Sequence, residues 1–269
     1  MLIRSLFIVL FCLLITPSVV GQLRHDEKVD TILPIFNKIP KKPWTAAGEI
    51  MIMNILINRL DANIRNVYWA KVTPTTWKNN LKIGFQTDWD HFTTNWLGHP
   101  VHGSLFFNAA RSNGYNYWGS LPFTVGGSLV WEYFGETQYA SEIDLFTTTM
   151  GGMYVGELTH RLTDLFKRKI SNKNKLLKNV AITALNPMGK LNSVLNKNYD
   201  GYNNYTPNVD LKYQFMFGSA YSLGKIGDDI KGFKGFVNLS MIYGDIFNHV
   251  SKPYNPFDFF ILRTWLDFN

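Results

Sequence analysis

The stretch that decides the fold runs from Asp88 to Arg111 and reads DWDHFTTNWLGHPVHGSLFFNAAR. It contains three of the six histidines of the chain, and Pro100 interrupts it. A proline inside a helix removes a backbone hydrogen bond and clashes with the preceding turn, so we expect a kink or a new helix start at Pro100. The histidine-rich stretch is therefore expected at a joint between two helices.

Hydrophobic periodicity predicts further helices on both sides of this joint. Residues 72–87 contain a proline, a glycine and two asparagines, and they are expected to be irregular. The predicted helices are Thr45 to about Leu60, one beginning near Asp88, Pro100 to about Ser112, Ser120 to Glu136, and Ser141 to about Lys167.

Glycines inside two of these helices predict close packing. Gly103 lies in one helix, and Gly151, Gly152 and Gly156 lie in another. Each glycine weakens an isolated helix by roughly 1 kcal/mol relative to alanine. We therefore expect these positions where a neighbouring backbone approaches closely.

After residue 208 the pattern changes from helical to alternating, which predicts strands at Val209–Leu223, Phe233–Gly244 and Phe257–Phe268. Each run is about ten residues, the length of a membrane β-strand. Three strands cannot close a barrel, so they cover the helices, pair with another chain or begin a larger barrel. The predicted fold class is α+β: a helical domain of about four helices, packed with or followed by an antiparallel β segment of outer-membrane type.

The N-terminus has the layout of a secretory signal peptide. Arg4 precedes the apolar run from Leu6 to Ile15, and small residues end it at Gly21. The run is too short for a membrane span, which needs about 20 residues. The predicted organisation is a signal peptide at 1–21, a polar tether at 22–44, the helical domain at 45–167, a basic linker at 168–208 and the β segment at 209–269.

The chain carries a net charge of +7, and 15% of its residues are aromatic. Since an exported protein meets little nucleic acid, we expect no nucleic-acid partner and favour membrane lipid or lipopolysaccharide as the anionic neighbour. Six basic residues between Lys167 and Lys178 suit such a partner, although a solvated linker explains them as well.

Histidines and carboxylates on neighbouring helices can donate and accept protons. On a straight helix His91, Asn95, His99 and His102 would lie within about 80° of one another. The candidate catalytic residues are His91, His99, His102 and Glu132, and the candidate ligand-binding residues are Asn95, Asn108, Arg111, Asp144 and Glu157. The alternative is a hydrogen-bonded polar core with a purely structural role.

The sequence patterns for metal binding, nucleophilic catalysis and cofactor binding are weak or absent. The histidines with Asp88 or Asp90 could bind a divalent metal, but their spacing matches no specific metal motif, and Glu157 and His160 form a Glu-x-x-His pair only once. No nucleophile motif, phosphate loop or dinucleotide motif is found. Glu132 and Glu136 can act as acid and base or be a buried pair neutralised by Arg111 or Arg161. We predict neither a metal nor a cofactor.

A set of ordered motifs spans about residues 77–161. They are Asn95, His99-Pro100-x-x-Gly103, Asn108-x-x-Arg111-Ser-x-Gly114, Trp131-Glu132-Tyr-Phe-Gly-Glu136, Ser141-x-x-Asp144 and Thr148-x-x-Gly-Gly152-x-x-x-Gly156-Glu157. The set resembles bacterial envelope proteins carrying domain of unknown function 3943. This resemblance implies a Gram-negative exported protein at the periplasmic side of the outer membrane, with no established activity. The resemblance implies that family members continue with more strands, and whether this chain is a truncated member stays open.

A fainter similarity to VanZ-like membrane proteins rests on Asp88-x-x-His91-Phe92, Glu132, and Asp144 followed by Gly151. It suggests lipid-linked ligands by analogy. We therefore expect an outer-membrane-associated protein whose inter-helical polar site binds or processes a lipid or lipid-linked envelope ligand. The alternative is a non-catalytic structural or assembly component, with an outer-membrane protein as partner.

Overall fold

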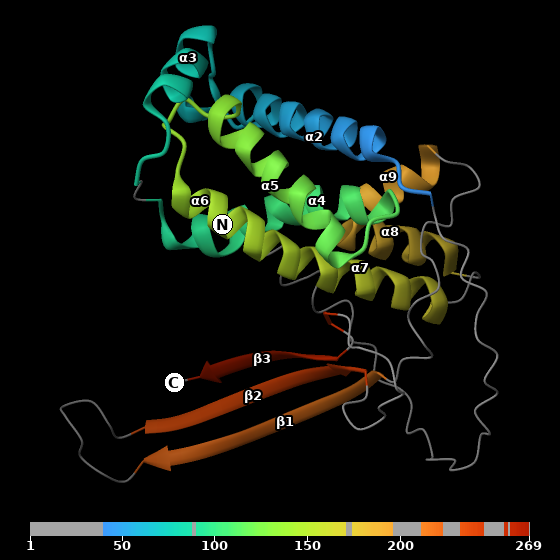
Figure 1. Ribbon diagram of the computed structural model, residues 1–269. Coiled ribbons are helices and arrows are strands. Elements are labelled where there is room, and N and C mark those ends of the chain that lie inside the picture. The colour runs from blue at the N-terminus through green and yellow to red at the C-terminus, as the bar shows by residue number, and fades with distance from the viewer. Residues whose placement is uncertain are drawn as a thin grey trace. The chain divides into compact units, whose positions relative to one another are not determined.

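A computed structural model describes residues 40–87, 90–170, 174–195, 211–222, 232–244, 256–257 and 259–268. These residues form helices and one three-stranded antiparallel sheet, which confirms the α+β class (Figure 1). The expected signal peptide, most of the tether and Asp88 lie outside the described residues.

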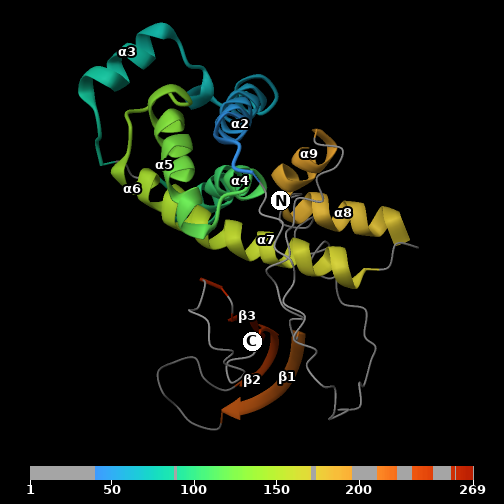
Figure 2. The same cartoon turned by 45° about the vertical axis from the view of Figure 1, so that its right-hand side comes forward.

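The central element of the helical part is α4 (His99–Ser112). It contacts α2, α5, α7 and α9, which surround it in Figure 2. The other elements are α2 (Pro43–Asn63), the 3-10 turn η1 (Tyr68–Ala70), α3 (Pro74–Ile83), the π-helical turns η2 (Thr94–Gly98) and η3 (Thr147–Gly151), α5 (Tyr117–Phe134), α6 (Glu142–Phe146), α7 (Gly152–Lys169), α8 (Lys175–Leu185) and α9 (Pro187–Leu195).

The expected joint at Pro100 is confirmed in a specific form. Pro100 is the second residue of α4, and the helical backbone continues into it from the turn before. The turn before it, η2, is π-helical rather than α-helical. A second π-helical turn, η3, joins α6 to α7 and contacts η2. Such turns are rare and occur often at functional sites.

The expected close packing of glycines is confirmed between α4 and the η3–α7 segment. A Cβ atom on Gly103 would lie 1.9 Å from the carbonyl oxygen of Thr148 and 2.9 Å from the Cα of Gly152. Gly156 packs against the ring of Phe107. These contacts bring the two backbones together and fix where α6 and η3 lie against the start of α4.

Two segments differ from expectation, and the described residues contain more helices than the four expected. Residues 74–83 form α3, because Thr73 and Thr76 make a capping box around Pro74. Residues 175–195, expected in a basic linker, form α8 and α9. The apolar spacing of this segment is interrupted by lysines and asparagines, yet Met188 is buried in the core against α2 and α4.

The sheet contains β1 (Leu211–Ser222), β2 (Gly232–Tyr243) and β3 (Phe260–Phe268), in that order. The three strands expected from the alternating pattern are confirmed. Leu239 in β2 pairs with Phe215 in β1 and Thr264 in β3. In the part of the chain that is described, no helix combines the length and the apolar character needed to cross a bilayer.

Candidate functional site

The first polar group, named here the His99 cluster, consists of Asp90, His99, Glu132, Glu136 and Asp144. His99 is the first residue of α4 and follows η2 directly. Glu132 lies in the last turn of α5. Asp144 lies in α6, where its backbone N–H donates to the Ser141 hydroxyl that caps the helix. Both π-helical turns therefore flank this cluster.

The His99 imidazole is held at both nitrogens. Its Nε2 lies 3.2 Å from Asp144 Oδ1 and 3.6 Å from Asp90 Oδ2. Its Nδ1 lies 3.1 Å from the hydroxyl of Thr148 in η3. His99 and Asp144 are buried and Asp90 is half-buried, so water reaches the cluster from the Asp90 side.

Charge balance in the cluster depends on His99. Burial by itself lowers the pKa of this imidazole, but the contact with Asp144 and the negative charges of Glu132 and Glu136 raise it to about 9. His99 is therefore protonated at neutral pH. The imidazolium offsets part of the negative charge that the carboxylates bring into the protein.

Glu132 and Glu136 are both shifted toward the protonated form. Burial, followed by the charge of Glu136, raises the pKa of Glu132 to about 8, although the Ser141 N–H donates to its Oε2 at 3.0 Å. Burial raises the pKa of Glu136 to about 7, against the effect of a hydrogen bond from Trp131. A protonated carboxyl group and an imidazolium in one cluster can exchange protons with a ligand near neutral pH.

The other two histidines of the opening stretch do not join His99. The His91 side chain is exposed. The His102 ring packs against Phe106 and Trp131, with centroid distances of 4.7 Å and 4.5 Å. Burial, followed by the charge of His99, lowers the pKa of His102 to about 3, so this ring is neutral. His102 acts as an aromatic core residue, and the three imidazoles do not converge on one metal position.

A separate Arg111 cluster contains Arg111, Glu157 and Arg161. Arg111 donates to both carboxylate oxygens of Glu157, at 2.8 Å and 3.1 Å. Arg161 donates to Glu157 Oε1 at 2.8 Å. Glu157 is fully buried. Arg111 follows His99 by twelve residues on α4, about 18 Å along the axis, so the expected single site is divided into two.

The remaining candidates hold helices together. Asn108 donates to the hydroxyl of Thr159 at 3.1 Å and accepts from the side chain of Asn186 at 3.3 Å, which connects α4 to α7 and to the loop before α9. Asn95 is half-buried in η2, and its Oδ1 has no hydrogen-bond partner among the described residues. The sequence left open whether Arg111 or Arg161 pairs with Glu132 and Glu136. Both arginines pair with Glu157 instead.

Sequence reasoning missed the Glu49 cluster. The side chains of Asn113 and Asn192 donate to the Glu49 carboxylate, the first at 2.9 Å and the second at 2.7 Å to its nearer oxygen. Burial raises the pKa of Glu49 to about 7, against the hydrogen bond from Asn113 and the charge of Lys42. The local signal was the Glu49 carboxylate among the apolar residues of α2. Its partners come from the residue that follows α4 and from α9, and no local pattern indicated them.

The Glu49→Gln variant is expected to remove a pH dependence of stability. Since folding raises the pKa of Glu49 from 4.5 to about 7, its contribution is present at low pH and is lost as pH rises through 7. Between pH 5 and pH 8, Glu49→Gln should gain about 3 kcal/mol relative to wild type. Urea unfolding at both pH values measures this, with exposed Glu142→Gln as control. An unchanged difference between Glu49→Gln and wild type would contradict the burial of Glu49.

The comparisons with known proteins give one match. Residues 84–188 match the family model described as domain of unknown function (DUF3943). Neither a curated protein nor a solved structure matches the chain, and the matches give no support to the VanZ-like similarity. The matched residues contain the His99 cluster and the Arg111 cluster. Over residues 84–188, the chain is therefore similar to the DUF3943 family.

Proposed function

We propose that the chain is an exported protein at the periplasmic side of the outer membrane, and that its His99 cluster binds or processes a lipid or lipid-linked envelope ligand. One observation carries the proposal: the buried His99–Asp144 pair lies in the same turns of the fold as exposed apolar side chains. The signal-peptide pattern and the envelope family resemblance support the location.

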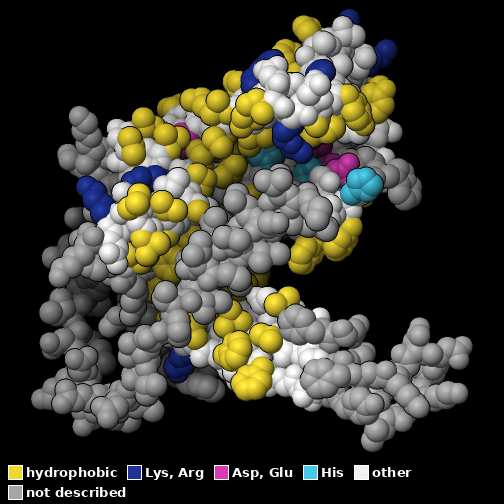
Figure 3. Space-filling model, turned by 180° about the vertical axis from the view of Figure 1, so that it is seen from behind, with side chains coloured by type: hydrophobic (Ala, Val, Ile, Leu, Met, Phe, Trp, Pro, Cys, Tyr) yellow, Lys and Arg dark blue, Asp and Glu magenta, His cyan; other side chains and the backbone are white. Residues whose placement is uncertain are grey.

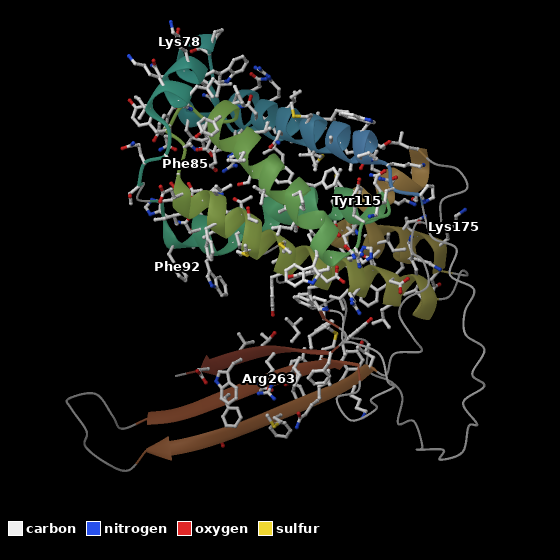
Figure 4. All side chains as sticks on the ribbon, viewed as in Figure 1. Lys78, Phe85, Phe92, Tyr115, Lys175 and Arg263 are labelled. Carbon is white, nitrogen blue, oxygen red and sulfur yellow. The ribbon has the colours of Figure 1, made fainter. Side chains whose placement is uncertain are left out.

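The exposed apolar side chains, named here the apolar rim, are those of Phe92, Trp96, Phe146 and Met150. Their exposed fractions are 73%, 70%, 64% and 47%. Phe92 and Trp96 stack with a centroid distance of 5.9 Å, and the labelled Phe92 side chain points away from the helices (Figure 4). The rim follows η2, α6 and η3, and the two π-helical turns contact each other. Large exposed apolar patches commonly mark ligand or membrane contacts.

The apolar rim and the His99 cluster would contact different parts of a lipid ligand. In Figure 3, histidine and acidic side chains gather at one place on the face shown, with hydrophobic side chains around them. Acyl or prenyl chains suit the aromatic rim, and a head group with hydroxyl or ammonium donors suits the carboxylates. Glu132, with its raised pKa, is the group we assign to proton transfer if the ligand is processed.

Glu132→Gln tests the site without removing the side-chain volume. Native mass spectrometry of the full chain in mild detergent should show a lipid adduct on wild type and its loss in Glu132→Gln, with an unchanged melting temperature. Glutamine still accepts the Ser141 N–H bond that fixes the start of α6. Exposed Glu142→Gln on α6 is the matched control and should keep the adduct.

The second candidate function is a non-catalytic structural or assembly role with an outer-membrane protein as partner. Tyr213, Phe215 and Phe217 of β1 favour it, because all three are more than half exposed on one face of the strand. Such a face suits a sheet of outer-membrane type. Under this alternative, Glu132→Gln lowers the melting temperature and leaves any bound lipid in place.

A further inference from the structure

The His99 cluster contains three metal-binding groups that converge from different elements. One ligand atom from each of Asp90, His99 and Asp144 lies within 4.8 Å of the other two. Asp90 precedes η2, His99 begins α4 and Asp144 lies in α6, so the packing of the helices assembles the group. These residues form no metal motif in the sequence, because the first and last of them are 54 positions apart.

The imidazole has the geometry of a metal ligand. A tetrahedral ion with ligand distances of about 2.1 Å needs donor atoms separated by about 3.4 Å. The separations from His99 Nε2 are 3.2 Å to Asp144 and 3.6 Å to Asp90. The opposite nitrogen, Nδ1, meets the Thr148 hydroxyl at 3.1 Å. A partner on this second nitrogen is what orients metal-binding histidines in proteins.

Two buried atoms of the His99 cluster have no well-directed hydrogen-bond partner among the described residues. His99 is only 6% exposed, and its Nε2, although close to both aspartates, completes no well-directed hydrogen bond. Glu132 is 3% exposed, and its Oε1 has no hydrogen-bond partner among the described residues, while its other oxygen accepts the Ser141 N–H. Buried polar atoms normally find partners, so a cation bound to His99 Nε2 would explain the first of these atoms.

We propose that Asp90, His99 and Asp144 bind one divalent transition-metal ion. A neutral imidazole and carboxylates together suit Zn²⁺ or Mn²⁺ better than Ca²⁺, which prefers oxygen ligands alone. Binding forms metal bonds to Nε2 and the carboxylate oxygens and releases the Nε2 proton to solvent. The two positive charges of the ion then balance Asp90 and Asp144. This inference is independent of the lipid proposal.

Metal binding to the full chain tests the proposal directly. After chelation and dialysis, isothermal titration with Zn²⁺ should give one site per chain, and Asp90→Asn should weaken it by about tenfold or more. Asp90 is half-buried and caps no helix, so this variant should keep the metal-free melting temperature. The matched control, Glu142→Gln, should bind Zn²⁺ like wild type.

A second readout identifies the nitrogen ligand. Electron spin echo spectra of Mn²⁺ bound to the full chain should show modulation from one nitrogen nucleus, and His99→Gln should remove it. If His99→Gln does not fold, the Zn²⁺ titration of Asp90→Asn still tests whether the ion binds at this site. Zn²⁺ binding that is equally tight in Asp90→Asn, or no saturable binding of either ion, would overturn the proposal.

Discussion

Gly103→Ala is expected to destabilise the protein by about 3 kcal/mol, the upper end of the cost of overpacking a core. The added methyl group would lie 1.9 Å from the Thr148 carbonyl oxygen. The next nearest atoms, the carbonyl carbon of Thr148 and the Cα of Gly152, also belong to the backbone. Because no flexible side chain can move aside, α4 and α7 must separate. Denaturant unfolding of the full chain measures the loss.

Gly126→Ala is the matched control for this substitution. Gly126 also lies inside a helix, α5, but an added Cβ meets nothing within 4 Å. Alanine should therefore stabilise that helix by about 0.5–1 kcal/mol. Equal stability of the Gly103→Ala and Gly126→Ala variants would show that the α4–α7 approach is looser than described.

Glu157→Ala is expected to cost about 4 kcal/mol, because it leaves two guanidinium groups without their shared carboxylate. Glu157 is fully buried and accepts three hydrogen bonds from Arg111 and Arg161. The exposed Glu142→Ala variant should change the unfolding free energy by less than about 0.5 kcal/mol. Thermal and urea unfolding compare the two.

A double variant identifies the cause of that loss. In Glu157→Ala/Arg161→Met, one of the two positive charges that Glu157 balances is removed, so part of the lost stability should return. If Glu157→Ala lost stability only because the volume of the carboxylate is missing, the double variant would not regain stability. A Glu157→Ala chain within about 1 kcal/mol of wild type would contradict the structural role of the Arg111 cluster.

Elements with a strong local signal were predictable from the sequence. The three alternating runs became β1, β2 and β3, and the positions of Pro100 and Gly103 predicted a joint and a close helix contact. Residues 175–195 were missed because lysines and asparagines obscure the apolar spacing, and the burial of Met188 depends on contacts with distant helices.

The sequence named His99, Glu132 and Asp144 as candidates, but it did not indicate which candidates lie together. The pairing of His99 with Asp144 depends on η3 and on the glycine contacts, which bring α6 to the start of α4. The separation of Arg111 from His99 follows from helix geometry alone, since twelve residues span about 18 Å. The sequence around His102 is compatible with a site residue and with a packed ring. Its contacts with Phe106 and Trp131 show that the ring is packed.

The central claim is that the His99 cluster and the apolar rim together hold a lipid or lipid-linked ligand. The most direct measurement is the native mass of the full wild-type chain extracted from membranes in mild detergent. The proposal predicts a mass above that of the polypeptide by one lipid, and a loss of that increment in Glu132→Gln at unchanged melting temperature. A wild-type mass equal to that of the bare polypeptide in several detergents would contradict the claim.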